Sequence, residues 1–468
     1  MSTLYPFRGG ASAAARSSCF VERVLASSDQ ARGPERRGAG SERGRFSLVP
    51  PMPVLARPEG EVLDECDGLL GGFFWQALRD VLLWAAAGPE ARRGLFVRPL
   101  AEIIGVPTEV PDVEAAIGEL LALSAAPERA EPARVAEACA ELALWAEGRE
   151  KKRTAAHFAE AAARVEPHVS ARSFTAGRLN RRLGDAVRAA MWYSRAARLA
   201  RLAYARGEKR SEVDFANAHL GYGNLQHDLG KYTPAEYHYL KAVRAALRSG
   251  RKSLAASAHH NLIGVAFDTG RVEKALEHAQ AAVRLLPSRH PEFPALVHDI
   301  ALLLLRQSYF SSAIPILEKV LPRLERRNNR LIALASLARC AAAVKDHIRF
   351  ERAASAVLAI VAEDNESSDT ALYHLAEGAR SFWEWERAHD LATQAIQIAR
   401  DRGNAAIIPL AERLLVAVAM HERGDVDQVP LEGGAIDALW QAVLRKLKKQ
   451  PAPDARPEAV PPEHYPID

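Results

Sequence analysis

The sequence predicts an all-α protein built of repeated helix-turn-helix units, and two observations carry this prediction. The first is a pair of residue sets that match at a spacing of 40: Gly230, Tyr232, Ala235, Tyr239 and Ala242, then Gly270, Val272, Ala275, Ala279 and Ala282. The second is a small residue that recurs at separations of 34, 46, 40, 38, 40 and 35 along most of the chain: Ala155, Ala189, Ala235, Ala275, Ala313, Ala353 and Ala388.

A third position supports the same register. The eighth residue of each unit is where the two helices of a pair cross most closely, and six of these seven residues are Gly or Ala: Ala143, Gly177, Gly223, Ile263, Ala301, Ala341 and Ala376. A large side chain at a close crossing pushes the helix axes apart, so small residues are required there. The pattern therefore predicts about seven helix pairs over residues 132–403.

These residues resemble the tetratricopeptide repeat, a helix-turn-helix unit of about 34 residues. The longer spacings of about 38–46 in the middle of the array are similar to those of kinesin light chains and bacterial peptide-sensing regulators. The resemblance implies a right-handed α-solenoid. Repeats two to four keep a glycine at the end of the first helix, and repeats five to seven do not; the residues at this place are Gly184, Gly230, Gly270, Ser308, Ile348 and Trp383.

The segment before the array divides in two. Residues 1–60 are rich in Arg, Gly, Ser and Pro and lack a helical period, which predicts a disordered arm; whether translation starts at Met1 or at Met52 stays open. Residues 61–125 have helical periodicity, which predicts a cap on the first open face of the array. Leu100–Val106 is similar to the start of a helix-turn-helix DNA-binding motif, but no Arg or Lys lies in residues 113–123, so we reject DNA binding there.

After the array, residues 405–449 predict a half-repeat followed by an amphipathic helix. Its apolar stripe and its terminal cations suit a C-terminal capping helix: Ile436, Leu439, Trp440, Val443, Leu444 and Leu447, then Arg445, Lys446, Lys448 and Lys449. A membrane-surface helix is the alternative, although its basic face is short. Residues 450–468 contain six prolines and predict a disordered tail.

Charge and cysteine content limit the classes of partner. Residues 1–60 contain nine Arg and five acidic residues, so the net charge of +4 belongs to this segment and the rest of the chain is neutral. A neutral body argues against nucleic-acid binding.

No run of residues is apolar enough to span a bilayer. Four isolated cysteines fit neither a disulfide framework nor a zinc site, so we expect a cytoplasmic location.

The sequence contains none of the short catalytic or phosphate-binding motifs, and we expect no enzyme activity and no cofactor. Histidines raise the question of a metal, above all His259-His260 with His219 and His227. Adjacent residues point to different faces of a helix, and three- or four-residue steps are needed to share one. His219 and His259 take a position that packs inside a repeat. We therefore predict structural histidines and no metal.

In the family that the chain resembles, positions 2, 5, 9, 12 and 13 of each first helix line the concave groove. Carried over, they predict these partner-binding residues: Arg178, Arg181, Arg182, Asn217, Asn224, His227, His260, Phe267, His298 and Arg306. Three arginines on one turn could hold a carboxylate in bidentate fashion, and Asn224 could pair with an extended peptide backbone. Two alternatives remain: the arginines form a solvated face, or they pair with Asp185, Asp214 or Asp228.

Together these features predict a scaffold or adaptor that binds a protein or peptide, with an acidic partner favoured. The alternative is a peptide-sensing regulator, in which a short ligand enters the groove and changes the compactness of the array. An enzyme with its own active site is the third class, and no motif supports it. The oligomeric state and the partner's identity cannot be inferred from these patterns.

Overall fold

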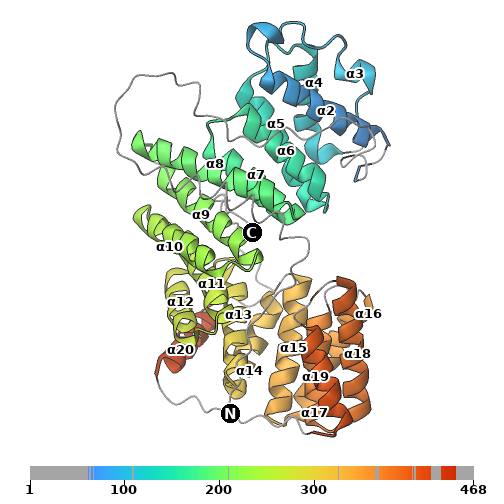
Figure 1. Cartoon of the computed structure of the whole chain (residues 1–468), viewed down its shortest axis with the longest axis vertical. Coiled ribbons are helices and arrows are strands. Elements are labelled where there is room, and N and C mark those ends of the chain that lie inside the picture. Colours follow the sequence, from blue (N-terminus) through green and yellow to red (C-terminus); the bar gives the residue numbers. More distant parts are fainter. Residues whose placement is uncertain are drawn as a thin grey trace. The chain divides into compact units, whose positions relative to one another are not determined.

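The structure is a computed structural model (Figure 1) and describes residues 62, 65–66, 68–107, 110–208, 210–324, 326–363, 368–402, 404, 407–422 and 434–449. The chain forms two compact units. The boundary between them lies between Leu254 and Ala255, inside α11 (Lys252–Asp268). The arm, the choice between Met1 and Met52, and the tail over residues 450–468 lie outside the described residues. None of the described helices combines the length and apolarity that crossing a bilayer requires.

The unit before Ala255 contains a first group of three helices and three helix pairs. The first group is α2 (Gly68–Ala86), α3 (Leu100–Ile103) and α4 (Glu114–Ala125), with two 3-10 turns at Glu90–Arg92 and Pro111–Val113. The pairs are α5 (Pro132–Gly148) with α6 (Lys152–Val165), α7 (Ser170–Leu183) with α8 (Ala186–Ala205), and α9 (Ser211–Asp228) with α10 (Tyr232–Arg248). In Figure 1 these helices run from blue to green.

Four helix pairs follow, beginning with α11. They are α11 with α12 (Val272–Leu285), α13 (Phe293–Arg306) with α14 (Phe310–Val320), α15 (Arg327–Ala343) with α16 (His347–Glu363), and α17 (Asp369–Ser381) with α18 (Trp385–Arg402). A 3-10 turn spans Leu321–Arg323. The unpaired helices α19 (Ile408–Ala419) and α20 (Gly434–Lys448) come last. The all-α fold and the seven predicted helix pairs are confirmed in the described chain.

Small residues hold each pair together. The seven predicted alanines of the second helices are all buried, with at most 3% of the residue exposed. At the crossing of α9 and α10, a Cβ atom on Gly223 would lie 2.5 Å from Cδ1 of Tyr239. On Gly177 it would lie 2.8 Å from Cδ1 of Tyr193. Glycine therefore lets an aromatic ring of the second helix lie directly against the backbone of the first.

The turns between the two helices of each repeat agree with the predicted repeat register except in repeat six. Gly184, Gly230 and Gly270 adopt positive φ as expected, and Ser308 and Trp383 do so in repeats five and seven. In repeat six the residue with positive φ is Lys345, three residues before the predicted Ile348. A shift of three residues is close to one helical turn, so it keeps the same face buried and the apolar pattern could not detect it.

The first group of helices packs on the first pair. Helix α2 lies against α6, and α4 lies against α5. The ring of Phe74 on α2 meets Trp145 and Phe158 edge-on, with centroid distances of 5.5 and 5.3 Å. Aromatic contacts of this geometry bury large apolar areas. They cover the end of the array that a repeat protein otherwise leaves exposed.

The last helix does not pack on the helix that precedes it. Helix α20 lies against α12 and α14, and buries Leu439, Val443 and Leu447. Trp440 Nε1 donates to the Ser312 carbonyl oxygen at 2.9 Å, and Lys446 Nζ donates to the Leu286 carbonyl oxygen at 2.6 Å. The amphipathic helix is present as predicted, and it covers second helices in the middle of the array rather than α19.

Candidate functional site

The predicted groove residues lie on the first helices α7, α9, α11 and α13, and many of them contact the neighbouring first helix. Arg178 on α7 binds Glu147 on α5 through two hydrogen bonds, with Nη1–Oε1 at 2.6 Å and Nη2–Oε2 at 2.8 Å. Arg182 donates to the same carboxylate. Burial alone would raise the pKa of Glu147, but the two arginines outweigh burial and hold it below its ordinary value.

The third arginine is also paired. Arg181 Nη1 lies 2.8 Å from Oδ2 of Asp228 on α9, one of the acids that the sequence analysis had named. Only 17% of the Arg181 side chain is exposed. Asp185 instead accepts a hydrogen bond from the backbone of Arg188 at the start of α8. Because all three arginines have carboxylate partners within the chain, the hypothesis that they hold an acidic ligand is weakened.

Glu147 was missed, although a signal for it exists. It lies four residues after the crossing residue Ala143, as Arg181 lies four residues after Gly177. The two therefore take equivalent places in repeats one and two. The predicted groove residues begin in repeat two, and an acid in repeat one is the natural neighbour of the basic cluster on α7.

Helix α9 presents the polar residues of repeat three. Asn224 Oδ1 accepts a hydrogen bond from the Tyr239 hydroxyl at 2.8 Å, so its amide oxygen is turned toward its own repeat. The side-chain oxygen of Asn217 is buried and makes no hydrogen bond within the described chain. The ring of His227 lies 5.8 Å from that of Tyr232. These residues are in place for a polar ligand on α9, and none of these contacts tests whether one binds.

In the second unit, Asp299 joins two of the predicted residues. His260 Nε2 on α11 lies 2.6 Å from Asp299 Oδ2, and His298 Nδ1 lies 3.1 Å from Asp299 Oδ1. Burial would raise the pKa of Asp299, but hydrogen bonds from both imidazoles outweigh it and hold this pKa well below its ordinary value. His298 itself is only 5% exposed and belongs to the core more than to a binding face.

The sequence analysis missed Asp299 because the groove positions that it took from the resembled family fall one residue away from Asp299 on α13. Asp299 and Arg306 are seven residues apart, which is close to two helical turns, so they share a face. His298 is displaced from that face by about 100°. The exposure pattern along α13 agrees, since Asp299 and Arg306 are more exposed than His298.

Arg306 continues this face. Its Cζ atom lies 3.7 Å from the ring centroid of Phe267 on α11, which is a close cation–π contact. On the next first helices, Arg339 of α15 lies with Nη1 3.2 Å from Nδ1 of His374 on α17. The sequence analysis missed Arg339 because of the shifted register of repeat six; moving the register back by three residues puts Arg339 at a groove position.

Two histidine pairs join the helices within a repeat. His219 Nδ1 on α9 lies 2.8 Å from His238 Nδ1 on α10, and His259 Nδ1 on α11 lies 3.3 Å from His278 Nδ1 on α12. The four residues occupy equivalent places 40 residues apart. One ring in each pair donates and the other accepts, which requires a neutral acceptor. His219 and His259 are thus packed inside their repeats, as predicted.

We expect the pairs to make the fold sensitive to acid. Burial first, and then the partner imidazole, lowers the pKa of His219 to about 2 and that of His259 to about 4. Below about pH 6.5, His219 and His259 become protonated in the unfolded chain but stay neutral in the folded one. The free energy of unfolding therefore falls as the pH falls. The loss approaches about 1.4 kcal/mol per pH unit for each histidine.

Urea titrations between about pH 7 and pH 4 measure this slope, since the contribution is fully present above about pH 6.5. The variant His219→Asn/His259→Asn should have a shallower pH dependence over the same window. An equal slope in both proteins would show that these two histidines do not titrate on unfolding as inferred.

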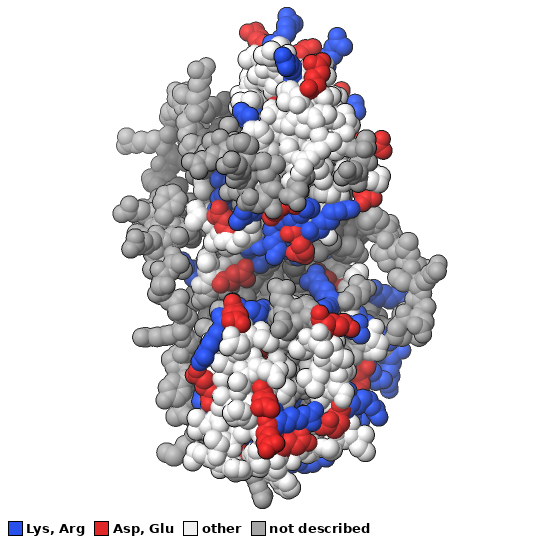
Figure 2. Space-filling model, turned by 90° about the vertical axis from the view of Figure 1, so that its right-hand side faces the viewer, with Lys and Arg blue, Asp and Glu red and all other residues white. Residues whose placement is uncertain are grey.

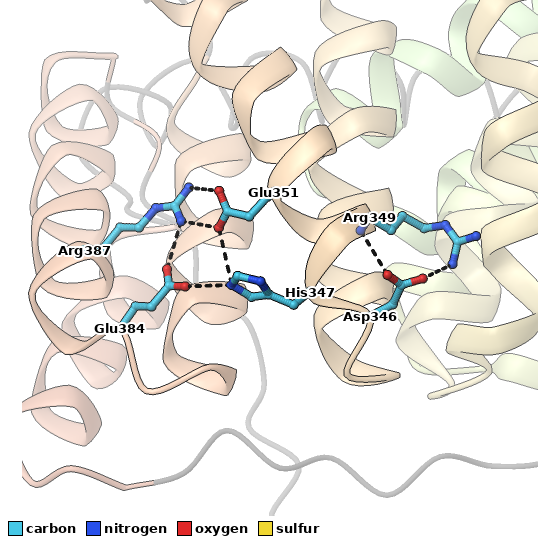
Figure 3. Close-up of polar contacts among 6 residues, drawn as sticks. All are labelled: Asp346, His347, Arg349, Glu351, Glu384 and Arg387. Carbon is cyan, nitrogen blue, oxygen red and sulfur yellow. Dashed lines mark hydrogen bonds and ion pairs between the residues drawn. The ribbon is translucent and has the colours of Figure 1, made fainter.

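One cluster in the described chain has the composition of a metal site (Figure 3). His347, Glu351 and Glu384 offer ligand atoms that lie within 4.8 Å of one another. Figure 3 shows the Arg387 guanidinium bridging both carboxylates, with Nη1 2.5 Å from Glu351 Oε1 and 2.9 Å from Glu384 Oε2. Arg387 already binds both carboxylates that a cation would need, so we interpret the cluster as an ion-pair network of α16 and the start of α18.

The same close-up shows a second ion pair at the start of α16. Asp346 Oδ1 accepts from the Arg349 backbone N–H at 3.0 Å, and its other oxygen accepts from the Arg349 side chain. This caps the helix N-terminus. Over the face in Figure 2, basic and acidic side chains are likewise interspersed.

Comparison with known proteins adds little beyond the fold. No family model matches the chain, and no curated protein sequence matches it. The apo form of RapI is 11% identical with a TM-score of 0.40, covering 61% of this chain and 98% of that one. BtubC from P. vanneervenii is 16% identical with a TM-score of 0.33, covering 55% and 93%. Aspartyl phosphate phosphatase F from Bacillus subtilis is 12% identical with a TM-score of 0.33, covering 79% and 88%.

At such low identities and TM-scores these likenesses carry no argument of their own, and the class of protein rests on the helices. Consecutive helix pairs, buried alanines on the second helices and small residues at the crossings define a tetratricopeptide-like repeat protein. Within each unit, polar side chains on the first helices reach from one repeat to the next.

Proposed function

We propose that the protein is an adaptor that binds a protein or peptide partner on the face made by its first helices. The observation that carries the proposal is the set of polar contacts between neighbouring first helices, which occurs in each unit: Arg178–Glu147 in the first, and His260–Asp299 and Arg339–His374 in the second. Within each unit these helices offer hydrogen-bonding groups, which suits an extended chain. Repeat arrays present such surfaces for binding rather than for chemistry.

Nine of the ten residues named from the sequence remain the proposed contact set; His298 leaves it because it is only 5% exposed. Arg178, Arg181 and Arg182 hold neighbouring acids, so we assign them first to the structure of α5, α7 and α9. Phe267 and Arg306 present an aromatic face and a cation on adjacent helices, and we place the stronger contacts there.

The test is to map where a partner binds. The full chain is immobilised, partners are captured from the native host and identified by mass spectrometry, and the purified complex is studied by hydrogen exchange. On binding, we expect slower amide hydrogen exchange in the first helices of repeats two to seven, which are α7, α9, α11, α13, α15 and α17. Protection confined to the second helices or to α2–α4 would contradict the proposal.

Once a partner has been captured, a second measurement distinguishes an adaptor from a peptide-sensing regulator. A synthetic peptide from the captured partner should bind a regulator and change its radius of gyration in solution scattering. An adaptor should need the folded partner for full affinity and should keep its dimensions. In either case we expect the partner on the first-helix face.

A further inference from the structure

The surface of α12 and α14 that α20 covers is distinct from the first-helix face, because both α12 and α14 are second helices. We call it the α12–α14 surface. Three side chains of α20 are almost fully buried there, at steps of four residues: Leu439, Val443 and Leu447. Steps of four follow one side of a helix. The α12–α14 surface therefore receives one side of an amphipathic helix, which is a recurring mode of peptide recognition.

The end of α12 provides a place for a cation. The Val283 carbonyl has no backbone donor four residues later, because that residue is Pro287. Lys446 Nζ donates to this carbonyl and also to the Leu286 carbonyl, the latter at 2.6 Å. The partial negative charge at the C-terminal end of a helix favours a cation there. The α12–α14 surface thus selects a lysine at one position of the helix that lies on it.

Trp440 holds α20 on α14. Its Nε1 donates to the Ser312 carbonyl oxygen at 2.9 Å, and its ring is partly buried against the same apolar core. The outward side of α20 is exposed and carries small or polar residues: Ala438, Gln441, Arg445 and Lys448. The contacts therefore define a pattern for the bound helix. It has apolar residues at steps of four, a tryptophan directly after the first of them, and a lysine directly before the last.

Helix α20 can leave this surface without breaking a repeat. All seven helix pairs of the described chain are complete without it, and residues 420–433 separate it from α19. A helix that is joined to its binding site by a chain segment occupies the site through a high effective concentration, even where its intrinsic affinity is modest. A second helix of the same pattern competes for the site by mass action.

We propose that the α12–α14 surface is a second binding site, for an amphipathic helix of a partner protein, and that α20 blocks this site until such a helix displaces it. The partner helix carries the pattern of α20, with the lysine directed at the carbonyl oxygens of Val283 and Leu286. The inference goes beyond the proposed adaptor function, because it concerns second helices and a helical ligand rather than first helices and an extended one.

The test supplies the helix separately from the full chain. The probe is a fluorescent peptide of residues 434–449, and Leu439→Asp/Val443→Asp in the full chain unseats α20 by placing two carboxylates on its buried side. In fluorescence anisotropy, we expect the probe to bind this variant at least about tenfold more tightly than the native chain, in which α20 occupies the site. A probe that carries the same two aspartates should bind neither protein.

A further probe examines the cation. The peptide with Lys446→Gln should bind the unseated variant at least about fivefold more weakly than the unchanged peptide, because it loses charge-assisted hydrogen bonds to α12. An unchanged affinity would contradict the part of the proposal that assigns a lysine to the ligand.

The matched control places two aspartates on the exposed side of α20. Ala438→Asp/Gln441→Asp changes the charge of the chain equally but leaves the apolar side seated, so the probe should bind it no better than it binds the native chain. Native chains that form dimers with rising concentration, where the unseated variant forms none, would show that the α20 of a second copy fills the site. That result would overturn the assignment to a partner protein.

A measurement on the native chain does not require any variant to fold. Amide hydrogen exchange should show α20 opening in a separate event, at least about tenfold more often than α12 and α14. The proposal is overturned if α20 exchanges only together with α12 and α14. It is also overturned if the unseated variant, with its far-UV circular dichroism retained, binds the probe no better than the native chain does.

Discussion

Replacing Gly223 by leucine is expected to lower the free energy of unfolding by about 1–3 kcal/mol or more. A Cβ atom at this position would lie 2.5 Å from both Cδ1 and Cε1 of Tyr239. That ring cannot move aside, because it is 1% exposed and its hydroxyl donates to Asn224 at 2.8 Å. The larger side chain must therefore separate α9 from α10, and a urea titration followed by far-UV circular dichroism measures the loss.

A graded pair of variants controls this experiment. Gly223→Ala introduces only the clashing Cβ atom and should already destabilise the fold. Gly118→Ala makes the same chemical change in the exposed part of α4, where nothing lies within 4 Å of the new atom, and should stabilise by about 0.4–1 kcal/mol. Equal effects of the two alanine substitutions would contradict the packing described for the crossing.

The second large effect is expected for Glu160→Ala, at about 3–5 kcal/mol of lost stability. Glu160 on α6 is 1% exposed. Its carboxylate accepts from Arg188 Nε on α8 at 2.7 Å and from Asn180 Nδ2 on α7 at 3.0 Å, and lies 4.0 Å from Arg164. Removing it takes away the buried carboxylate that the guanidinium groups of Arg164 and Arg188 share.

Glu212→Ala is the matched comparison. Glu212 also pairs with an arginine, at 2.8 Å, but Arg248 is 57% exposed and water can replace the lost partner. Exposed ion pairs contribute about 0.2–1 kcal/mol. If denaturant titrations show Glu160→Ala to be no more costly than Glu212→Ala, then the carboxylate of Glu160 is not the buried link between three helices that its contacts indicate.

The helix pairs could be predicted because their packing depends on local periodicity. Small residues recur wherever two helices of a pair cross, and this pattern is legible without knowing any distant contact. The error in repeat six has the same origin. Ala338 and Ala341 are both buried, so a shift of three residues leaves the pattern intact and only the backbone of Lys345 reveals it.

Pairings between helices could not be predicted in the same way. The acids that hold the arginines of α7 come from α5 and α9, 31 to 47 residues away in sequence. Composition showed that Arg178, Arg181 and Arg182 form a basic cluster but not which carboxylate reaches each one. Asp299 was missed because the register carried over to α13 was one residue out, and Arg339 was missed because the register of repeat six was three residues out.

Helix α20 also has a consequence for how the chain is made. The surfaces that it covers on α12 and α14 are synthesised long before it: Lys446 contacts the carbonyl of Val283, which lies 163 residues earlier. At about 5–20 residues per second, a ribosome takes roughly 8–30 s to cover that distance. Throughout this interval the nascent chain has the apolar sites for Leu439, Val443 and Leu447 open to other molecules. We expect a chain that ends before residue 434 to keep these apolar sites exposed, which favours association with other molecules.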